Sequence, residues 1–377
     1  METAYVLVNL GNVLHLLAAV YWLLVTAIVL PGVCLAYYLM PLSLLRCVNY
    51  GLYLKIEHKL CRMVNDHWAA AAYWFGLSVS EYGEDIREIS EQRCIVTVNH
   101  LGMVDHFVVM MALANKGSVV EKYLWIIFHI WKWTPLGVAW MLHGNFFVSG
   151  GKQVRERLLS SLREHLQRQY WKNEHGWIIL YPEGTRLFLI KEASQRYAKR
   201  HGLPQVNHVA LPRLGAVKTV LETCCPTKNL INSKVDSQVS PKHTPPLQYL
   251  VDVTLGFPRG LVPDIGTLTS GRWPKSLRNV AVNYRFFDIS RIPVDSENAL
   301  NDWLMERWVE KDRLLDHFYR TGAFPGARHQ PQQQFSFSRI VLTELFWIVS
   351  MQLHMKLWIR PILALIWSGL LVLLGAH

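Results

Sequence analysis

The uncharged N-terminal segment constrains this chain most, because there is no Asp, Glu, Lys or Arg between Thr3 and Leu45. Residues 13–40 are almost wholly apolar or aromatic, and about 20 such residues suffice to cross a bilayer. Pro31-Gly32 and Pro41 interrupt this segment. We predict one span at roughly residues 10–30, followed by a kinked piece near the interface. A tight re-entrant hairpin is the alternative.

The C-terminal end carries two further apolar stretches, residues 340–355 and 361–376, with Lys356 and Arg360 between them. Each stretch is shorter than the roughly 20 residues that a span needs. We therefore predict an interfacial or hairpin anchor, or a single span. A pair of buried core helices is the alternative.

Composition narrows the class of protein. Lys and Arg number 39 and Asp and Glu number 28, which gives a formal net charge of +11. Hydrophobic residues make up 51% of the chain and charged residues 18%, below the roughly 25% charged residues of ordinary soluble domains. These values exclude a disordered or collagen-like chain and disfavour a freely soluble enzyme.

The positive charge predicts the partners. Basic proteins bind nucleic acids, anionic membrane surfaces or acidic small molecules. The sequence has no long Lys/Arg run, no zinc-finger spacing and no aromatic RNA-binding pattern, so we expect no nucleic acid partner. A lipid bilayer and phosphorylated substrates fit better.

Two features predict a reducing, cytosolic setting for most of the chain. None of the six cysteines belongs to a C-x-x-C pair, and there is no Asn-x-Ser/Thr sequon. Four basic residues between positions 46 and 62 directly follow the first apolar segment, and positively charged flanks of membrane spans face the cytosol.

The middle of the chain is predicted to be α/β. Short apolar runs at residues 94–98, 177–181, 249–254 and 280–286 are typical of strands, and residues 154–170 have helical spacing. Strands that alternate with helical patterns predict a mixed sheet covered by helices. Functional sites in such folds gather where strands end.

We divide the chain into five parts. These are an N-terminal membrane anchor (1–48), amphipathic interfacial helices (49–81), the α/β domain (82–325), a linker (326–338) and a C-terminal membrane anchor (339–377). Within the α/β domain, residues 119–148 are rich in Trp and poor in charge. They form either a core helix plus loop or a surface that dips into lipid.

The block Asn99-His100-Leu101-Gly102-Met103-Val104-Asp105 follows the first predicted strand. A neutral imidazole can take a proton from a hydroxyl, and a carboxylate at its other nitrogen fixes the tautomer and stabilises the imidazolium. A helix that begins after the strand would bring His100 and Asp105 together. A plain surface pair is the alternative. A metal site that adds His106 is disfavoured, because Asp105 and His106 project differently from a helix and no third ligand has suitable spacing.

The block Tyr181-Pro182-Glu183-Gly184-Thr185-Arg186 ends another predicted strand. Gly184 lets the backbone approach a ligand closely, and Thr185 adds a hydroxyl. Arg186 can donate two hydrogen bonds to phosphate oxygens. Glu183 either holds Arg186 in place or receives a substrate hydroxyl. An ordinary turn after a strand is the alternative.

Two weaker blocks complete the pattern, HGNFFV at residues 143–148 and VALPR at residues 209–213. In this order the four blocks resemble the glycerolipid acyltransferase superfamily of lysophosphatidic acid acyltransferases. The signatures of that family are NHxxxxD, Gly-x-x-Phe, Phe/Tyr-Pro-Glu-Gly-Thr-Arg and a proline-centred block. The resemblance covers roughly residues 82–324. Its lysophosphatidylglycerol acyltransferase branch is similar at both apolar ends and at residues 82–90, 211–216, 284–293 and 310–325.

The resemblance implies an endoplasmic reticulum enzyme, facing the cytosol, that moves an acyl group from acyl-CoA to the hydroxyl of a lysophospholipid. Acyl-CoA is then a co-substrate, and no cofactor or metal is implied. His100 would be the base and Asp105 would orient it. The alkoxide would attack the thioester directly. The residues implied to bind substrate are Asn99, Gly144, Phe147, Glu183, Gly184, Thr185, Arg186 and Pro212.

The sequence departs from the family at one place. The second block often ends in a basic residue, whereas Val148 is followed here by Ser149-Gly150-Gly151-Lys152. Lys152 or Arg155 is the candidate substitute. Two other functions remain open. They are a CoA-independent phospholipid transacylase that uses the same His/Asp pair, and a catalytically silent membrane-binding protein that retains the fold.

Overall fold

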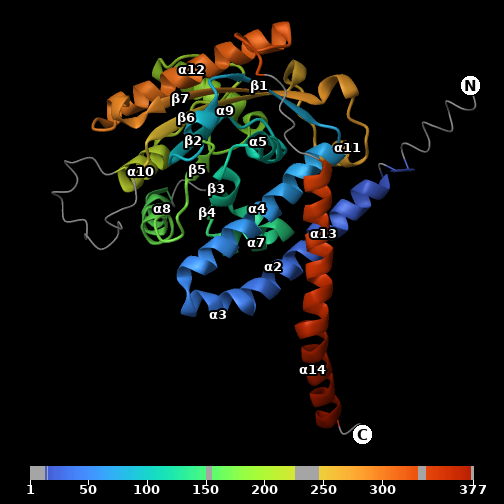
Figure 1. Ribbon diagram of the computed structural model, residues 1–377. Helices are drawn as coiled ribbons and strands as arrows, with labels where there is room; N and C mark the ends of the chain where they lie inside the picture. The colour runs from blue at the N-terminus through green and yellow to red at the C-terminus, as the bar shows by residue number, and fades with distance from the viewer. Residues whose placement is uncertain (1–12, 15, 150–154, 226–245, 330–336, 375–377) are drawn as a thin grey trace, which may run out of the picture.

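A seven-stranded mixed sheet organises the described part of the chain. The computed structural model describes residues 13–14, 16–149, 155–225, 246–329 and 337–374. The strands are β1 (Ser78–Gly83), β2 (Cys94–Val98), β3 (Leu124–Phe128), β4 (Phe146–Val148), β5 (Trp177–Leu180), β6 (Tyr249–Gly256) and β7 (Asn279–Asp288). Their order is β1-β7-β6-β2-β5-β3-β4 (Figure 1). Strands β6, β2, β5, β3 and β4 run parallel, and β7 and β1 run the opposite way.

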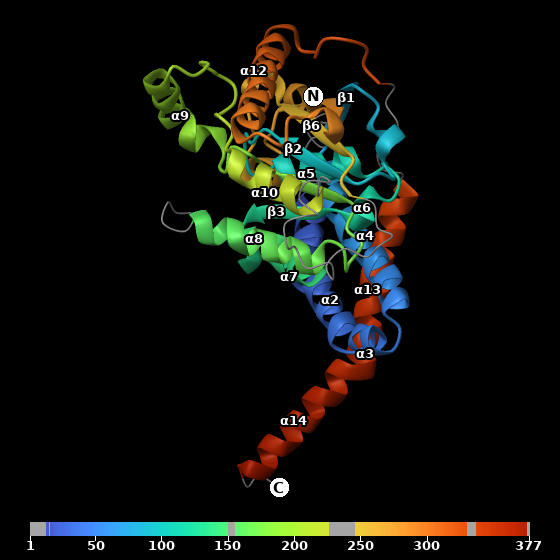
Figure 2. The same ribbon diagram turned by 90° about the vertical axis from the view of Figure 1, so that its left-hand side faces the viewer.

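Helices cover both faces of the sheet. One face carries α8 (Arg155–Gln169), α10 (Leu214–Cys224) and α12 (Glu297–Thr321), which Figure 2 shows stacked across the front of the sheet. The other face carries α4 (Tyr50–Trp74), α5 (Asp105–Leu113), α6 (Val119–Lys122) and α7 (Pro135–His143). In β2, Val96 and Val98 face this second layer whereas Ile95 faces the first. Burial on both faces explains why this strand reads as a continuous apolar run.

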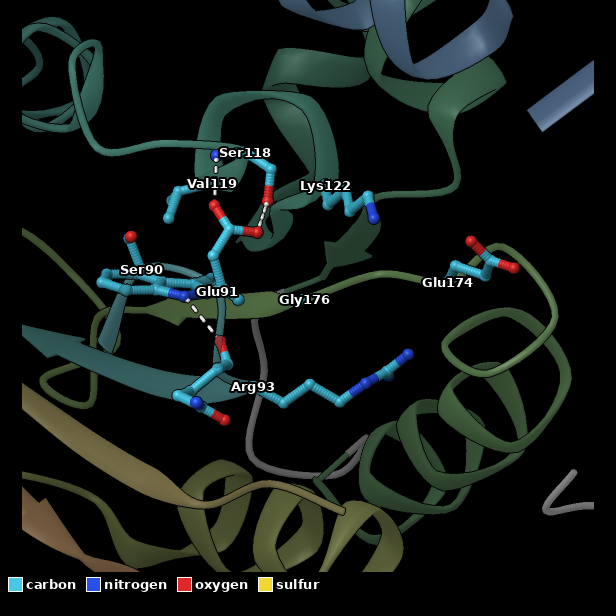
Figure 3. Close-up of a pocket in the computed structure, with 10 residues that line it drawn as sticks. Ser90, Glu91, Arg93, Ser118, Val119, Lys122, Glu174 and Gly176 are labelled. Atoms are coloured by element: carbon cyan, nitrogen blue, oxygen red, sulfur yellow. Dashed lines mark hydrogen bonds between the residues drawn. The ribbon is translucent and has the colours of Figure 1, made fainter. Parts of the chain in front are cut away.

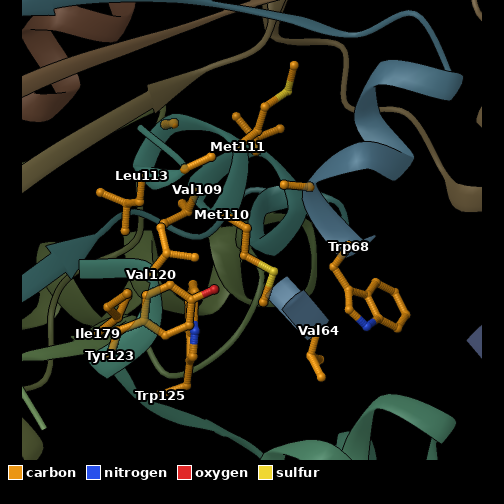
Figure 4. Close-up of a cluster of buried hydrophobic side chains, with 14 of the residues drawn as sticks. Val64, Trp68, Val109, Met110, Met111, Leu113, Val120, Tyr123, Trp125 and Ile179 are labelled. Carbon is orange, nitrogen blue, oxygen red and sulfur yellow. The ribbon is translucent and has the colours of Figure 1, made fainter. Parts of the chain in front are cut away.

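Helix α4 belongs to the core. Figure 4 shows Val64 and Trp68 of α4 beside Val109 and Met110 of α5, in one buried cluster that reaches Ile179 of β5. Residues 49–81 therefore differ from the interfacial helices that we expected. Their end also differs, because β1 pairs with β7 from Ser78 onward, so the sheet begins before the expected boundary at residue 82.

The sequence analysis found four strands and missed three. Strands β3 and β4 lie within residues 119–148, where we expected a core helix plus loop or a surface that dips into lipid. Only α7 and the 3-10 turn η3 (His129–Trp133) separate them. Both strands are short and are stabilised by pairing, because β3 pairs with β5 and β4, at the edge of the sheet, pairs with β3. Strand formation that depends on pairing with neighbours leaves only a weak pattern in the local sequence, which is why these two strands were not predicted.

The N-terminal segment folds as a helical hairpin with α4. Helix α2 (Leu30–Leu39) continues the preceding helix through Pro31, and the chain turns only at Met40 and Asn49, on either side of α3 (Pro41–Val48). The π-helical turn η1 (Val25–Val29) precedes Pro31. Such a wider turn accommodates the proline ring, which would otherwise collide with the preceding turn. The helix therefore continues through Pro31, whereas the interruption that we expected near Pro41 is present as the turn at Met40.

The C-terminal stretches form one helix, which rules out the hairpin and agrees with the single continuous segment among the alternatives that we expected. Helix α13 (Phe337–His354) continues through the π-helical turn η8 (Met355–Ile359) into α14 (Arg360–Leu373). As at Pro31, the π turn directly precedes a proline, Pro361. Two helices, Leu16–Val48 and Phe337–Leu373, are long and apolar enough to cross a membrane. Figure 1 shows α14 extending away from the domain.

Polar contacts inside apolar surroundings connect the two ends of the chain. Glu344 of α13 lies 2.6 Å from His67 Nδ1 of α4 and accepts a hydrogen bond from the Tyr21 hydroxyl at 2.9 Å. The other ring nitrogen of His67 lies 2.9 Å from the Thr26 hydroxyl. Arg339 pairs with Asp66 of α4 at 2.6 Å. A carboxylate in an apolar helix is costly to bury without partners, so these contacts determine where α13 docks.

We expect Glu344→Ala to destabilise the fold, because it leaves Nδ1 of the buried His67 without its partner and removes the acceptor of the Tyr21 hydroxyl. Breaking a buried pair in this way costs about 3–5 kcal/mol. The measurement is the thermal unfolding midpoint of the detergent-purified protein. Glu306→Ala, at an exposed position of α12, is the matched control. Equal midpoints for the two variants would contradict the role of Glu344.

Candidate active site

The predicted His–Asp pair forms at the carboxyl end of β2. His100 Nδ1 lies 2.8 Å from Asp105 Oδ2. The same oxygen accepts hydrogen bonds from the backbone N–H groups of Leu101 and Gly102, at 2.6 and 2.9 Å. Asp105 is the first residue of α5 and is fully buried, and a helix N-terminus favours a negative charge. The turn therefore holds the carboxylate rigidly, and Nε2 of His100 faces away from it.

Aromatic rings form the wall beside His100. Its imidazole stacks on Tyr181 with a centroid distance of 4.2 Å, and the ring of His106 meets it edge-on at 5.8 Å. His106 is buried among Tyr181, Trp125, Trp131 and Trp140. Burial, reinforced by the nearby His100, lowers the pKa of His106 well below its usual value. His106 is therefore a neutral ring of the wall.

A buried carboxylate, Glu183, connects three of the sequence blocks. Its Oε1 accepts hydrogen bonds from the His100 backbone N–H and from Trp308 Nε1 of α12, each at 3.2 Å. Its Oε2 accepts one from the Ala210 N–H at 3.3 Å. Burial raises the pKa of Glu183 to about 8, although these N–H donors favour the charged form. Glu183 thus points into the protein, in contrast to the substrate contact that we expected.

Helix α12 also places a buried cation, Lys311, between itself and strand β6. Lys311 is fully buried, and its Nζ lies 2.7 Å from Asp252 of β6 and 5.1 Å from the Trp308 ring centroid. Asp252 in turn accepts a hydrogen bond from Thr97 of β2 at 3.0 Å. Burial lowers the pKa of Lys311. The ion pair is one way in which α12 is held against β2 and β6, so Trp308 is positioned by a polar contact as well as by apolar packing.

The Pro182–Arg186 turn carries the exposed part of the site. Gly184 has φ +76°, a conformation that favours glycine. The backbone N–H of Arg213 donates to Pro182 O at 2.8 Å, and its guanidinium lies beside Gly184. Pro212 is buried, whereas Thr185 and Arg186 are half-buried. The turn therefore joins the third and fourth blocks and presents the guanidinium groups of Arg186 and Arg213 on this edge.

Two expected substrate contacts lie elsewhere or are already occupied. The Asn99 side chain is buried and exchanges two hydrogen bonds with the Leu255 backbone, so it joins β2 to β6. Gly144 ends α7 with φ +95° and lies beside Asn173 and His175. These two residues precede β5, so Gly144 lies at the amino ends of the strands, opposite to His100. A third, Phe147 of β4, pairs with Ile127 of β3 near the carboxyl ends of the strands and stays a predicted contact.

Only one of the two candidates for the missing basic residue, Lys152 and Arg155, can be placed in the structure. Lys152 lies outside the described residues. Arg155, the first residue of α8, has its guanidinium beside Gly215 in the first turn of α10. Because α10 begins directly after Arg213, Arg155 lies near the proline-centred block.

A polar cavity of about 180 Å³ lies at the opposite edge of the sheet (Figure 3). Its walls come from residues that precede β2, β3 and β5, such as Arg93, Ser118 and Gly176. Glu91 closes one side by accepting hydrogen bonds from the Ser118 N–H and hydroxyl. The cavity is thus separated from His100 by the length of the strands. Among the described residues no cluster of three or more His, Cys, Asp or Glu could hold a metal ion.

Comparison with known proteins identifies the class. Residues 79–227 match the family described as Acyltransferase, and residues 275–347 match the family described as Acyltransferase C-terminus. Together with the relatives below, these matches show that the chain belongs to the glycerolipid acyltransferase superfamily, as its motifs predicted.

The relatives are named as acyltransferases that act on lysophospholipids. A Caenorhabditis elegans protein named as a 1-acyl-sn-glycerol-3-phosphate acyltransferase is 37% identical over 97% of this chain and 91% of its own length. Human acyl-CoA:lysophosphatidylglycerol acyltransferase 1 is 33% identical over 84% of each chain. A solved structure, the 1-acyl-sn-glycerophosphate (LPA) acyltransferase PlsC from Thermotoga maritima, is 14% identical, with a TM-score of 0.46, over 81% of this chain and 97% of that chain.

Sequence reasoning missed three residues of this site. Arg213 follows Pro212 in a block that we had singled out, so its charge was an available signal. Tyr181 is the first residue of its block, but its stacking on His100 depends on the distance between β2 and β5. Trp308 lies 125 residues from Glu183, and no local pattern connects them.

We expect Trp308→Phe to lower kcat about tenfold without unfolding the protein, because it removes one donor to a buried carboxylate and keeps the ring. We expect activity to rise as Glu183 ionises near pH 8. The indole N–H lowers the pKa of Glu183, so its loss should shift this rise to higher pH. The measurement is kcat across pH, together with the unfolding midpoint. Trp303→Phe, half-buried on the same helix, is the control. An unchanged pH profile would contradict this positioning role.

Proposed function

We propose that this protein is a membrane-bound acyl-CoA:lysophospholipid O-acyltransferase. The acceptor is lysophosphatidylglycerol or a related lysophospholipid such as lysophosphatidylethanolamine. The observation that carries the proposal is the His100–Asp105 contact at 2.8 Å, beside a turn that presents Arg186. The relatives' names support the reaction class, and one of them includes the acyl-CoA donor.

The proposed chemistry follows from the two ends of the imidazole. His100 Nε2 takes the proton from the acceptor hydroxyl as its oxygen attacks the thioester carbonyl, while Asp105 at Nδ1 stabilises the imidazolium. The C–S bond then breaks, the new ester forms, and the CoA thiolate receives the proton from His100. The electron-rich face of Tyr181, stacked on the ring, further stabilises the cationic form. The reaction needs no cofactor besides its co-substrate.

The proposed binding groups are the basic side chains near the carboxyl ends of the strands, on the same side of the sheet as His100. Arg186 and Arg213 bind the acceptor phosphate, with Thr185 and the Gly184 backbone beside it, and Arg155 adds charge near the proline-centred block. Lys152 remains a candidate of the same kind. The net charge of +11 suits the polyanionic CoA.

We further propose the endoplasmic reticulum membrane, with the sheet domain on the cytosolic side. The two apolar helices supply the anchors, and the basic flank that follows the first of them favours this orientation. Cytosolic acyl-CoA then reaches the site directly.

We expect His100→Ala to abolish turnover, by at least about a hundredfold, while the protein stays folded and membrane-bound. The measurement is thiol release from acyl-CoA across a panel of lysophospholipids. Asp105→Asn keeps the shape of the turn and removes the charge, so it should lose most activity as well. Unchanged turnover in His100→Ala would contradict the general-base role. If the wild type releases no thiol with any acceptor, a transacylase or a catalytically silent membrane protein is favoured. A labelled phospholipid donor distinguishes these two.

We expect Arg186→Ala to raise the acceptor KM about tenfold, with a smaller fall in kcat. A charge-assisted hydrogen bond to phosphate is worth about 1.5–3 kcal/mol, and uniform binding appears in KM rather than in kcat. Steady-state kinetics at saturating acyl-CoA is the measurement. Arg196→Ala, on the exposed side of α9 (Leu187–His201), is the matched control. An unchanged acceptor KM would refute the assignment.

A further inference from the structure

The segment η3 has two faces with opposite properties. Trp131 points inward, where it is buried and its ring lies 5.4 Å from that of His106. Its neighbours Ile130 and Trp133 point outward and are 55% and 79% exposed. Phe128, at the end of β3, is exposed as well. A single turn thus joins the aromatic wall beside His100 to a set of uncovered apolar side chains.

The apolar surface continues onto the N-terminal helix. Helix α7, whose Met141 is exposed, packs against both η3 and the segment Val25–Val29. Leu23, Leu24 and Ile28, in and beside that segment, are all more than two-fifths exposed. Only 33% of the apolar window of helix Leu16–Val48 is buried inside the protein. Its outer face therefore needs an apolar environment, and η3 and α7 lie directly beside it.

The chemistry of η3 fits the boundary of a bilayer. The sequence of Phe128–Trp133 interleaves aromatic and aliphatic residues with His129 and Lys132. Lys132 Nζ lies 5.8 Å from the Trp133 ring centroid. Trp is enriched at the membrane interface, where its ring meets lipid and its N–H meets water. Lysine there pairs with anionic headgroups.

We propose that Phe128, Ile130, Trp133 and Met141, here called the η3 patch, insert into the lipid surface beside the catalytic histidine. The bilayer then contacts the wall of the site itself as well as the two anchor helices. This inference rests on the proposed function for its purpose, which is to admit a lipid acceptor sideways from the membrane. The physical contact with lipid can be tested without any activity.

The decisive measurement is a spin label on the full-length protein in vesicles of phosphatidylcholine and phosphatidylglycerol. Cys47, which is exposed, and the half-buried Cys225 are first changed to Ser. A nitroxide at Trp133→Cys should collide more often with oxygen, which concentrates in lipid, than with a water-soluble nickel chelate. A nitroxide at the exposed position Glu306→Cys should show the opposite order. Equal nickel accessibility at both positions would overturn the proposal. Low access by both reagents at position 133 would overturn it in favour of a protein partner.

Kinetics gives a second, independent test. Trp133→Asp should raise the KM for a long-chain lysophospholipid in vesicles about tenfold, since burying an aromatic side chain is worth at least one decade of affinity. The KM for a short-chain, water-soluble acceptor should change less than about twofold by the same reasoning, because no insertion is needed. Trp133→Phe should behave like the wild type. Equal changes for both acceptors would contradict lipid docking and indicate a distorted site. If no acceptor reacts at all, the proposed function fails while the spin-label result still stands.

Discussion

The buried Glu183 carboxylate is the contact on which the site depends. It accepts hydrogen bonds from N–H groups of His100, of the segment before Pro212 and of α12. Without the carboxylate, the loop after β2 and the segment before Pro212 would lose the contact that joins them, and loops at the ends of parallel strands have few other contacts. The fully buried Lys311–Asp252 pair fastens α12 to the sheet. The position of His100 is therefore set by residues from both matched family regions.

The same physical rule governs the two ends of the chain. A polar group in an apolar helix is tolerated only where partners surround it. Glu344 finds His67 and Tyr21, and Asp66 finds Arg339, so α13 docks against the N-terminal hairpin. None of the described residues of α14 is buried in the protein. The continuous C-terminal helix therefore has two parts. The first part, α13, packs against the domain, whereas the described residues of α14 make no buried contact with it.

The aromatic wall gives the site its chemical character. His106 is kept neutral by burial, and the rings of Tyr181 and Trp131 leave little room for water on that side of His100. Exclusion of water matters for any acyl transfer, because water competes with the acceptor hydroxyl for the reactive carbonyl. The η3 patch adjoins this wall, because Ile130 of the patch is next to Trp131 in the sequence. A lipid surface there would extend the dry environment from the protein into the membrane.

Local patterns were sufficient for part of this molecule. The strand at residues 94–98 and the His100–Asp105 pair could be predicted, because both depend on residues a few positions apart. The blocks were also enough to identify the family. Strands β3 and β4, the inward orientation of Glu183 and its contact with Trp308 could not be predicted, since each depends on segments distant in the chain. The continuity of the C-terminal helix through Pro361 likewise depends on a π turn that has no signature in composition. Spacing along the chain therefore determined which groups could pair locally, whereas long-range packing decided which of them are buried and which are exposed, because burial depends on segments far apart in the sequence.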